Sequence, residues 1–448
     1  MQKLILPGEW GNDSFPPFPN SFIPPPPKRK VGRRKKRHHL AVISVVVLLT
    51  LMLTAGSAFA FFKLKNTSLT SNAIYQSGMS NQSQAQNDQT QMSNQSQTVD
   101  RNMRAVSTIN GLQRISVIGS TAFIVDGHGR TISADPNPYG IALAPTGAPV
   151  SQTPGSLKPG DIVVTNFGAN QTGTTLVRFP AGKGPGQLFN TMANAGTKGP
   201  AFEAFNTLTG TDWVANFSAN NVQVFRPNGS VLATITSPLF KMPWAQAFNH
   251  GLHNPMDGSV DSFFTTNTAD ATIDRIDVIP TRNGTTFRVF QIGQLTQMNG
   301  GTKINAAWVP SLQVGSHHYT DVLLALDLAN NRVAAYPNST TLNTTTMRST
   351  SKGITVFGGK PLNMPGGLTI NPLNGDLLVV NLNDNNLVEL NLSQGKAVGE
   401  RLLDTVPVDA QSGNGSALFG VAAARDAQGN LEVFFTDDNM NTLNLLSR

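Results

Sequence analysis

The sequence predicts an all-β fold, a six-bladed β-propeller, preceded by a single transmembrane helix and a disordered linker. Three observations predict it: a repeat of roughly 50 residues, about four β-prone runs in each repeat, and an uncharged stretch near the N-terminus. A single four-stranded sheet cannot bury both of its faces, whereas sheets packed around an axis bury them and protect their edges. The repeat therefore predicts a radial array of small sheets.

The clearest repeat unit is Asn374–Leu392, which reads NGDLLVVNLNDNNLVELNL. An apolar run ends at Asn381, a cluster of Asn and Asp follows, and a shorter alternating run begins. Because Asn and Asp tolerate the left-handed backbone of tight turns, the two runs predict a β-hairpin. The same arrangement occurs six times, and the first run ends each time in a residue that we call a turn residue. These six turn residues, spaced by 50, 51, 60, 54 and 56 positions, are Asn166, Asn216, Asn267, Asp327, Asn381 and Asp437.

A further apolar run precedes most hairpins, often opened by Pro or Gly, as in PYGIALAP from Pro138 and PGGLTINP from Pro365. The chain ends on the third strand of the sixth unit. We therefore expect the segment from Arg114, RISVIGSTAFIVDGHG, to supply the outer strand of the last blade and to clasp the two ends together. A separate hairpin on the surface is the alternative.

The stretch PGGLTINPLNGDLLVVNLNDNNLVELNL resembles the repeat of NHL and YVTN-type β-propellers, of the senescence-marker/gluconolactonase-like superfamily. The resemblance covers Arg114 to Arg448. It implies a six-bladed propeller, but not a function, since such propellers include metal-dependent lactonases, lyases and binding scaffolds. The lactonases hold a divalent ion at the axis with one Glu, two Asn and one Asp. Here Pro138 to Pro145 contains no acidic residue, so the Glu is missing.

The six turn residues have two interpretations. They can be turn formers only, or they can form a ring of polar groups near the axial mouth that binds a ligand. No Gly-x-Ser-x-Gly elbow, Cys nucleophile or His-Glu-x-x-His motif occurs in the sequence, so no catalytic residue is predicted. We predict a binding or scaffolding module, with a metal-dependent propeller enzyme of the lactonase, hydrolase or lyase type as the alternative.

Four histidines suggest a metal site. His250 and His253 (FNHGLHNPMDGS) and His317 and His318 (QVGSHHYTD) are expected between the first and second strands of units three and four. Loops of one type lie on one face of a propeller, so the two pairs could approach each other and bind Zn or Cu through neutral imidazoles. Exposed, unpaired histidines are the alternative. No other cofactor is predicted.

The N-terminal part predicts the location of the protein. Residues 1–39 form a Pro-rich and basic tail, and residues 40–62 (Leu40 to Phe62) contain no charge and would span roughly 34 Å as a helix. The basic run KRKVGRRKKRHH directly before the span predicts a cytoplasmic N-terminus and an extracellular propeller at the plasma membrane. Cleavage after Ala60 is the alternative to a retained anchor.

Composition adds to this assignment. Residues 63–104 are rich in Asn, Gln and Ser and predict a disordered tether, which leaves residues 105–448 for the propeller. From residue 105 onward there are 20 Lys and Arg against 22 Asp and Glu, so the basic net charge of +7 belongs to the N-terminal part and no nucleic-acid binding is expected. The absence of Cys favours a bacterial or archaeal surface. The predicted partners are the membrane and an unidentified surface ligand.

Overall fold

The computed structural model describes residues 106–146, 156–182, 184–190, 196–254, 258–342, 349–409 and 415–448. The predicted tail, membrane span and linker lie outside the described residues. Within the ranges that are described, no helix has the length and apolar character to cross a membrane.

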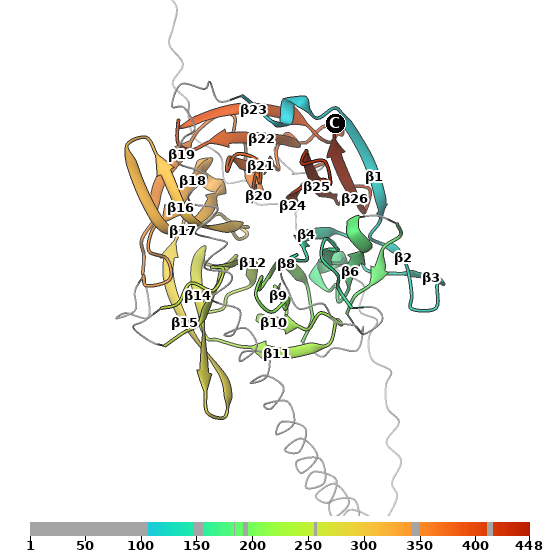
Figure 1. Ribbon diagram of the computed structural model, residues 1–448, viewed down its shortest axis with the longest axis horizontal. Helices are drawn as coiled ribbons and strands as arrows, with labels where there is room; N and C mark the ends of the chain where they lie inside the picture. Colours follow the sequence, from blue (N-terminus) through green and yellow to red (C-terminus); the bar gives the residue numbers. More distant parts are fainter. Residues whose placement is uncertain are drawn as a thin grey trace, which may run out of the picture. The chain divides into compact units, whose positions relative to one another are not determined.

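The described residues form six sheets around a common axis, as the repeat predicts, and all their strand pairs are antiparallel except one in blade 1 (Figure 1). In each sheet the first strand of the repeat lies closest to the axis. From the innermost to the outermost strand, blade 2 contains β8 (Pro200–Phe205), β9 (Asp212–Asn216), β10 (Asn221–Phe225) and β11 (Val231–Ile235); blade 3 contains β12 (Pro243–Phe248), β13 (Asp261–Asn267), β14 (Thr272–Thr281) and β15 (Gly284–Gln294); blade 4 contains β16 (Ala306–Val314), β17 (His317–Asp327), β18 (Arg332–Tyr336) and β19 (Ile354–Gly358); and blade 5 contains β20 (Pro365–Ile370), β21 (Leu377–Asn381), β22 (Asn386–Asn391) and β23 (Lys396–Leu402).

The predicted clasp between the two ends of the propeller is confirmed. Blade 6 consists of β24 (Val421–Arg425), β25 (Leu431–Asp437) and β26 (Thr442–Ser447), with β1 (Arg114–Ser120) as its outer strand. The antiparallel pairing runs from Arg114 opposite Ser447 to Ser120 opposite Thr442. The N-terminal strand thus closes the circle of blades.

The second half of the predicted closing segment behaves differently. Its run at Phe123–Val125 (β2) leaves blade 6 and joins blade 1, where Val125 pairs in parallel with Gln187. The fourth strand of blade 1 contains only two residues, and β2 and β3 extend the sheet beyond it. Blade 1 therefore has six strands, from the axis outward β4 (Pro138–Leu143), β5 (Ile162–Asn166), β6 (Leu176–Phe179), β7 (Gln187–Leu188), β2 (Phe123–Val125) and β3 (Thr131–Ser133). Among the described residues, four short 3-10 helices lie in the loops: η1 (Ile109–Gly111), η2 (Ala169–Gln171), η3 (Pro180–Gly182) and η4 (Leu328–Asn330).

A threonine directly before the turn residue ties three of the joints between blades. The Thr165 hydroxyl accepts the Gly140 N–H of its own inner strand at 2.8 Å and donates to the Ala201 carbonyl of blade 2 at 2.5 Å. Thr266 and Thr436 make the equivalent donations to Ile304 of blade 4 and to Tyr139 of blade 1. Each of these threonines bonds to the inner strand of the neighbouring blade or to the residues that lead into it.

A left-handed asparagine directly before the third strand links the three remaining joints and adds a second bond at the joint of blades 6 and 1. Asparagine tolerates this backbone conformation better than most residues. In each case its side-chain oxygen accepts a backbone N–H from the loop that leads into the next blade. The pairs are Asn220 with Met242 (2.8 Å), Asn331 with Met364 (2.7 Å), Asn385 with Ala417 (3.1 Å) and Asn441 with Asn137 (2.7 Å). Together with the threonines, these contacts cover all six joints.

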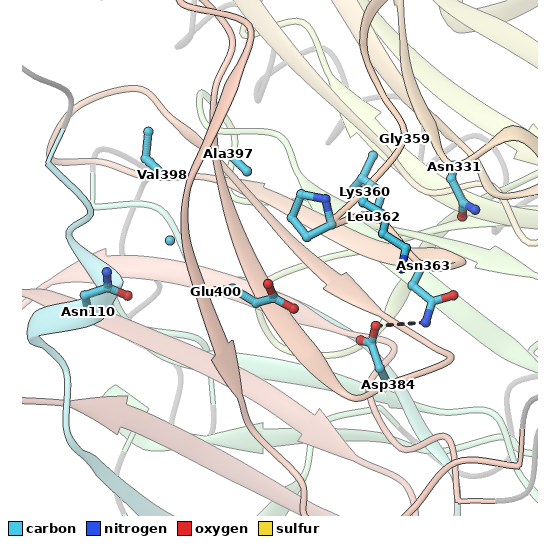
Figure 2. A pocket seen from close by; sticks show the side chains of 12 residues that line it. Asn110, Asn331, Gly359, Lys360, Leu362, Asn363, Asp384, Ala397, Val398 and Glu400 are labelled. Atoms are coloured by element: carbon cyan, nitrogen blue, oxygen red, sulfur yellow. Dashed lines mark hydrogen bonds between the residues drawn. The ribbon is translucent and has the colours of Figure 1, made fainter.

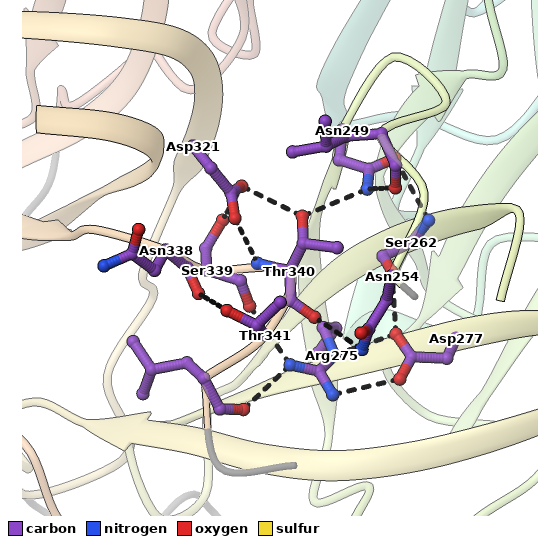
Figure 3. A network of polar contacts seen from close by, with 12 residues as sticks. Asn249, Asn254, Ser262, Arg275, Asp277, Asp321, Asn338, Ser339, Thr340 and Thr341 are labelled. Carbon is purple, nitrogen blue, oxygen red and sulfur yellow. Dashed lines mark hydrogen bonds and ion pairs between the residues drawn. The ribbon is translucent and has the colours of Figure 1, made fainter. Parts of the chain in front are cut away.

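A buried polar network adds to the joint between blades 3 and 4 (Figure 3). The wholly buried Arg275 donates to both carboxylate oxygens of Asp277, at 2.8 and 3.0 Å, and to the backbone carbonyls of Ser339 and Leu342. Asp321 accepts from the Trp308 indole and from the loop that contains Ser339. The network fixes this loop against the two blades.

Candidate functional site

The six turn residues occupy equivalent positions at the ends of the second strands and are buried. Their side chains bond within the propeller. Asn267 accepts the Lys241 N–H at 2.8 Å, and Asn381 accepts the Asn363 N–H at 3.1 Å and donates to the Pro361 carbonyl at 2.9 Å. These bonds hold the backbone that enters the inner strand of the same blade. The turn residues therefore have a local role in the turns, and their role in ligand binding stays a prediction.

The axial mouth beside these turns is filled with aromatic side chains, which we call the axial aromatic cluster. Its members are at most 7% exposed: Tyr139, Phe167, Phe202, Phe217, Trp244 and Phe419. The Tyr139 ring lies 4.1 Å from Phe419, 4.6 Å from Phe167 and 5.5 Å from Trp244 between centroids. Because these rings come from blades 1, 3 and 6, they meet across the axis and close it.

Lys303 lies over the axial aromatic cluster. Its Nζ is 4.9 Å from the ring centroid of Phe419, 5.3 Å from Trp244 and 5.7 Å from Tyr139, distances that allow cation–π attraction. Burial lowers the pKa of Lys303, and the Asp438 carboxylate opposes that shift. Burial raises the pKa of Asp438 to about 7, with Asp437 adding to the rise and Lys303 opposing it. The mouth thus carries an ammonium and a carboxyl group that titrates near neutrality.

The sequence interpretation missed Lys303, although a signal for it exists. The inner strands of blades 1, 2, 3 and 5 begin with Pro138, Pro200, Pro243 and Pro365. Thr266 binds the Ile304 carbonyl as Thr165 binds that of Ala201, which directly follows Pro200. Lys303 therefore occupies the position of the proline in blade 4, where a long charged side chain replaces a residue that has no polar side chain.

A groove of about 1040 Å³ lies at the ends of blades 4 and 5 where the second strand turns into the third (Figure 2). It is built from the turn of blade 4, the loop into blade 5, the turn of blade 5, four consecutive residues of β23 and the η1 segment. Its polar side chains are three amides, two carboxylates and one amine: Asn110, Asn331, Asn363, Asp384, Glu400 and Lys360. Its apolar floor includes Pro361, Leu362 and Val398.

The polar groups of the groove are held in place and remain accessible. Asn363 donates to the Asp384 carboxylate at 2.9 Å, and Asn386 donates to Glu400 at 2.9 Å. Figure 2 shows Glu400, Asp384 and Asn363 grouped together, with Asn110 on the other side of the strand. Lys360 and Glu400 are exposed. The groove therefore offers several fixed hydrogen-bonding groups of both kinds to a polar ligand.

The N-terminal segment is fastened beside this groove. The wholly buried carboxylate of Glu389 accepts the backbone N–H groups of Thr108 (2.7 Å) and Ile109 (3.2 Å). It also accepts the hydroxyls of Ser107 (2.9 Å) and Thr108 (2.6 Å). The chain that leads from the predicted anchor thus enters the propeller next to Asn110, at one edge of the groove.

Two buried carboxyl groups lie at the joint of blades 1 and 2. Neither Glu203 nor Asp212 has a hydrogen-bond partner of ordinary geometry for its carboxyl oxygens among the described residues. Burial raises the pKa of both groups well above the usual range; the charge of Asp212 adds to the shift of Glu203, and the Thr165 hydroxyl and the Ala142 amide oppose it. These carboxyls are therefore most stable in the protonated form.

The predicted approach of the two histidine pairs is not seen. The ring of His250 lies 5.4 Å from Trp308, whereas His317 pairs with Val314 at the far end of β16, roughly 20 Å along the strand. His317 and His318 also belong to β17 instead of the loop before it, because the hairpin of blade 4 is longer than the sequence pattern indicated.

The described residues include no group of three or more His, Cys, Asp or Glu side chains that could hold a metal ion. His253 is exposed, three residues after His250. Binding of Zn or Cu by these histidines stays a prediction.

Comparison with known proteins finds matches among solved structures. No protein-family model and no curated protein matches the chain. The chain is a six-bladed β-propeller. Similar solved structures include catalytically inactive virginiamycin B lyase from Staphylococcus aureus with quinupristin, which is 14% identical with a TM-score of 0.42 over 75% of this chain and 99% of that one. A putative gluconolactonase is 10% identical with a TM-score of 0.46 over 77% and 96% of the two chains.

A third similar structure is a protein of unknown function from Bacteroides thetaiotaomicron, 12% identical with a TM-score of 0.46 over 74% of this chain and 75% of that one. At these identities the likeness concerns the fold alone. The activities in these names say nothing about the reaction or ligand of this propeller.

Proposed function

We propose that the chain is a membrane-tethered β-propeller that binds a ligand at the cell surface, and that the groove of blades 4 and 5 is the binding site. The groove itself carries this proposal. It combines a volume of about 1040 Å³ with amide, carboxylate and amine groups, whereas aromatic rings fill the axial mouth. Ligand sites in proteins are concave and hold a few fixed polar groups over an apolar floor.

The lining favours a hydroxyl-rich ligand, such as a surface oligosaccharide. Amides and carboxylates together donate to and accept from sugar hydroxyls, and the lining contains three amides and two carboxylates against one amine. Such a balance gives little net charge, so neither a strongly acidic nor a strongly basic ligand is favoured.

The location rests on the sequence. The uncharged residues 40–62 and the basic run before them support an anchor with the propeller outside the cell. The chain also enters the propeller beside the groove, through the contacts of Glu389 with Thr108 and Ile109. Because the tether is attached at this edge, the groove lies close to the attachment point. A polymer of the cell envelope would be within its reach there.

An enzyme is the second candidate. The observation that favours it is the carboxyl of Asp438, whose pKa is raised by burial to about 7, beside the ammonium of Lys303 at the axial mouth. A carboxyl group that titrates near the operating pH is suited to general acid–base catalysis. A metal-dependent lactonase, hydrolase or lyase would in addition need a metal site, and the described residues include no group of three or more His, Cys, Asp or Glu side chains that could hold an ion.

The test is an affinity measurement with a panel of soluble oligosaccharides on the full-length protein. The double variant Lys360→Ala with Glu400→Gln should weaken binding about tenfold or more, because each lost hydrogen bond to a charged group contributes about 1.5–3 kcal/mol. The matched control is Arg288→Ala on β15 of blade 3, which is also exposed and should leave binding unchanged. Equal binding by both variants would exclude the groove.

A further inference from the structure

At the axial mouth, the ammonium group of Lys303 lies over three aromatic rings. Lys303 Nζ lies within 5.7 Å of three ring centroids, those of Phe419, Trp244 and Tyr139. The three rings come from blades 6, 3 and 1, and the lysine comes from the loop that enters blade 4. Four blades therefore contribute to one small site, distinct from the groove of blades 4 and 5.

A primary ammonium suits this site poorly. It carries three N–H donors, yet among the described residues Lys303 makes no hydrogen bond or ion pair that would satisfy them. Rings attract the positive charge but accept N–H groups only weakly. Lys303 is therefore held at the rings by its charge and not by a hydrogen bond to a described residue.

A quaternary ammonium has no such need. Its charge is spread over methyl groups that pack against rings and require no hydrogen-bond acceptor, which is why aromatic surrounds recognise it. Asp438 supplies a nearby negative charge, and its buried Oδ1 has no hydrogen-bond partner in the described chain. The indole Nε1 of Trp244 is also buried and unpartnered there.

We infer that the rings of Tyr139, Trp244 and Phe419 with the carboxylate of Asp438 form a binding site for a small quaternary ammonium compound, which Lys303 occupies in the absence of ligand. Lys303 is only half-buried and stands on a flexible four-carbon stem, so it can leave the rings for solvent. The ligand binds by displacing it.

The experiment uses the full-length chain in maltoside micelles, because that detergent has no quaternary head group. Tetramethylammonium chloride is the probe, and saturation-transfer NMR of its methyl protons reports binding, with sodium chloride at equal ionic strength as reference. Lys303→Ala removes the competing ammonium and should tighten binding about tenfold or more. Lys158→Ala, an exposed lysine in the loop between β4 and β5 of blade 1, should leave the affinity at the wild-type value.

A matched pair of variants in the Lys303→Ala background tests the rings. Tyr139→Phe keeps the ring and should keep the affinity, whereas Tyr139→Leu removes it and should weaken binding about fivefold or more. If Lys303→Ala binds no more tightly than the wild type, or if the Phe and Leu replacements behave alike, the site does not exist.

A second measurement needs no substitution. Reductive methylation with ¹³C-formaldehyde places methyl labels on the lysine amines, and those on Lys303 should show resonances shifted upfield by the ring currents. Tetramethylammonium should return these resonances to the value of exposed lysines. A Lys303 signal that is unshifted, or that does not respond to the probe, would overturn the inference.

Discussion

Asp261 should make the propeller more stable in acid than at neutral pH. This carboxyl group begins β13, is 3% exposed, and accepts the side-chain N–H of Asn206 from blade 2 at 3.0 Å. Burial raises its pKa from 3.8 to about 6, and the bond from Asn206 opposes the rise. The folded protein therefore favours the protonated form of Asp261 more than the unfolded chain does.

The sign and the magnitude follow from this shift. A carboxyl group whose pKa is higher in the folded state contributes stability that is fully present below pH 4 and is lost as the pH rises through 6. The rise from 3.8 to about 6 is about two units, and each unit corresponds to about 1.36 kcal/mol, so the loss is about 3 kcal/mol. Glu203 and Asp212, whose pKa values burial also raises, act in the same direction.

The assay is urea unfolding of a fragment spanning residues 105–448 at pH 4, 6 and 8, for the wild type and for Asp261→Asn. The asparagine keeps the shape and an acceptor for Asn206 but cannot ionise. Relative to the wild type, the variant should gain about 3 kcal/mol in unfolding free energy between pH 4 and pH 8.

Asp126 is the control, because the backbone N–H of Arg130, followed by its side chain, lowers the pKa of this carboxyl to about 2. Asp126→Asn should therefore alter the pH dependence only in acid and with the opposite sign. If the unfolding free energies of the wild type and Asp261→Asn change in parallel from pH 4 to pH 8, the explanation by burial is wrong.

Four further outcomes are expected. Arg275→Ala should cost about 3–5 kcal/mol in unfolding free energy because it leaves Asp277 buried without its cation, whereas the exposed Arg130→Ala should change little; equal effects would contradict the role of the network. Asn331→Ala should cost about 2 kcal/mol, since it loses the bond to the next blade and strains a left-handed position, and an unchanged urea midpoint would exclude such a tie. Deletion of residues 114–120 should lower the melting temperature greatly, and an unchanged value would show that the clasp is dispensable. Protease added outside intact cells should release the propeller by cutting within residues 66–104, and full protection would contradict the proposed orientation.

The six blades and their closure could be predicted because the signals are local. Turn chemistry near Asn381 and its five equivalents acts over a few residues, and the spacing of these turns sets the number of blades. The clasp followed from counting strands in the last repeat. The addition of β2 to blade 1 could not be predicted, since it depends on a single parallel contact, Val125 with Gln187, between edges far apart in sequence.

The candidate sites were harder to predict because they depend on contacts between blades. Lys303 lies over rings from three other blades, and no short stretch of sequence indicates this contact. The same holds for the bonds between Glu389 and Thr108, which join positions 281 residues apart. The interpretation of His317 and His318 as loop residues was wrong because a two-residue turn, Gly315 and Ser316, is enough to connect the long strands β16 and β17.

The most direct test of the proposed function is photo-crosslinking on the cells that carry the protein. A photoreactive amino acid in place of Ala397, an exposed residue of β23 in the groove, should crosslink the full-length protein to a surface carbohydrate polymer. The same replacement at Arg288, exposed on β15 of blade 3, should give no such product. Equal crosslinking from the two positions, or crosslinking from position 397 only to protein, would contradict a carbohydrate-binding groove.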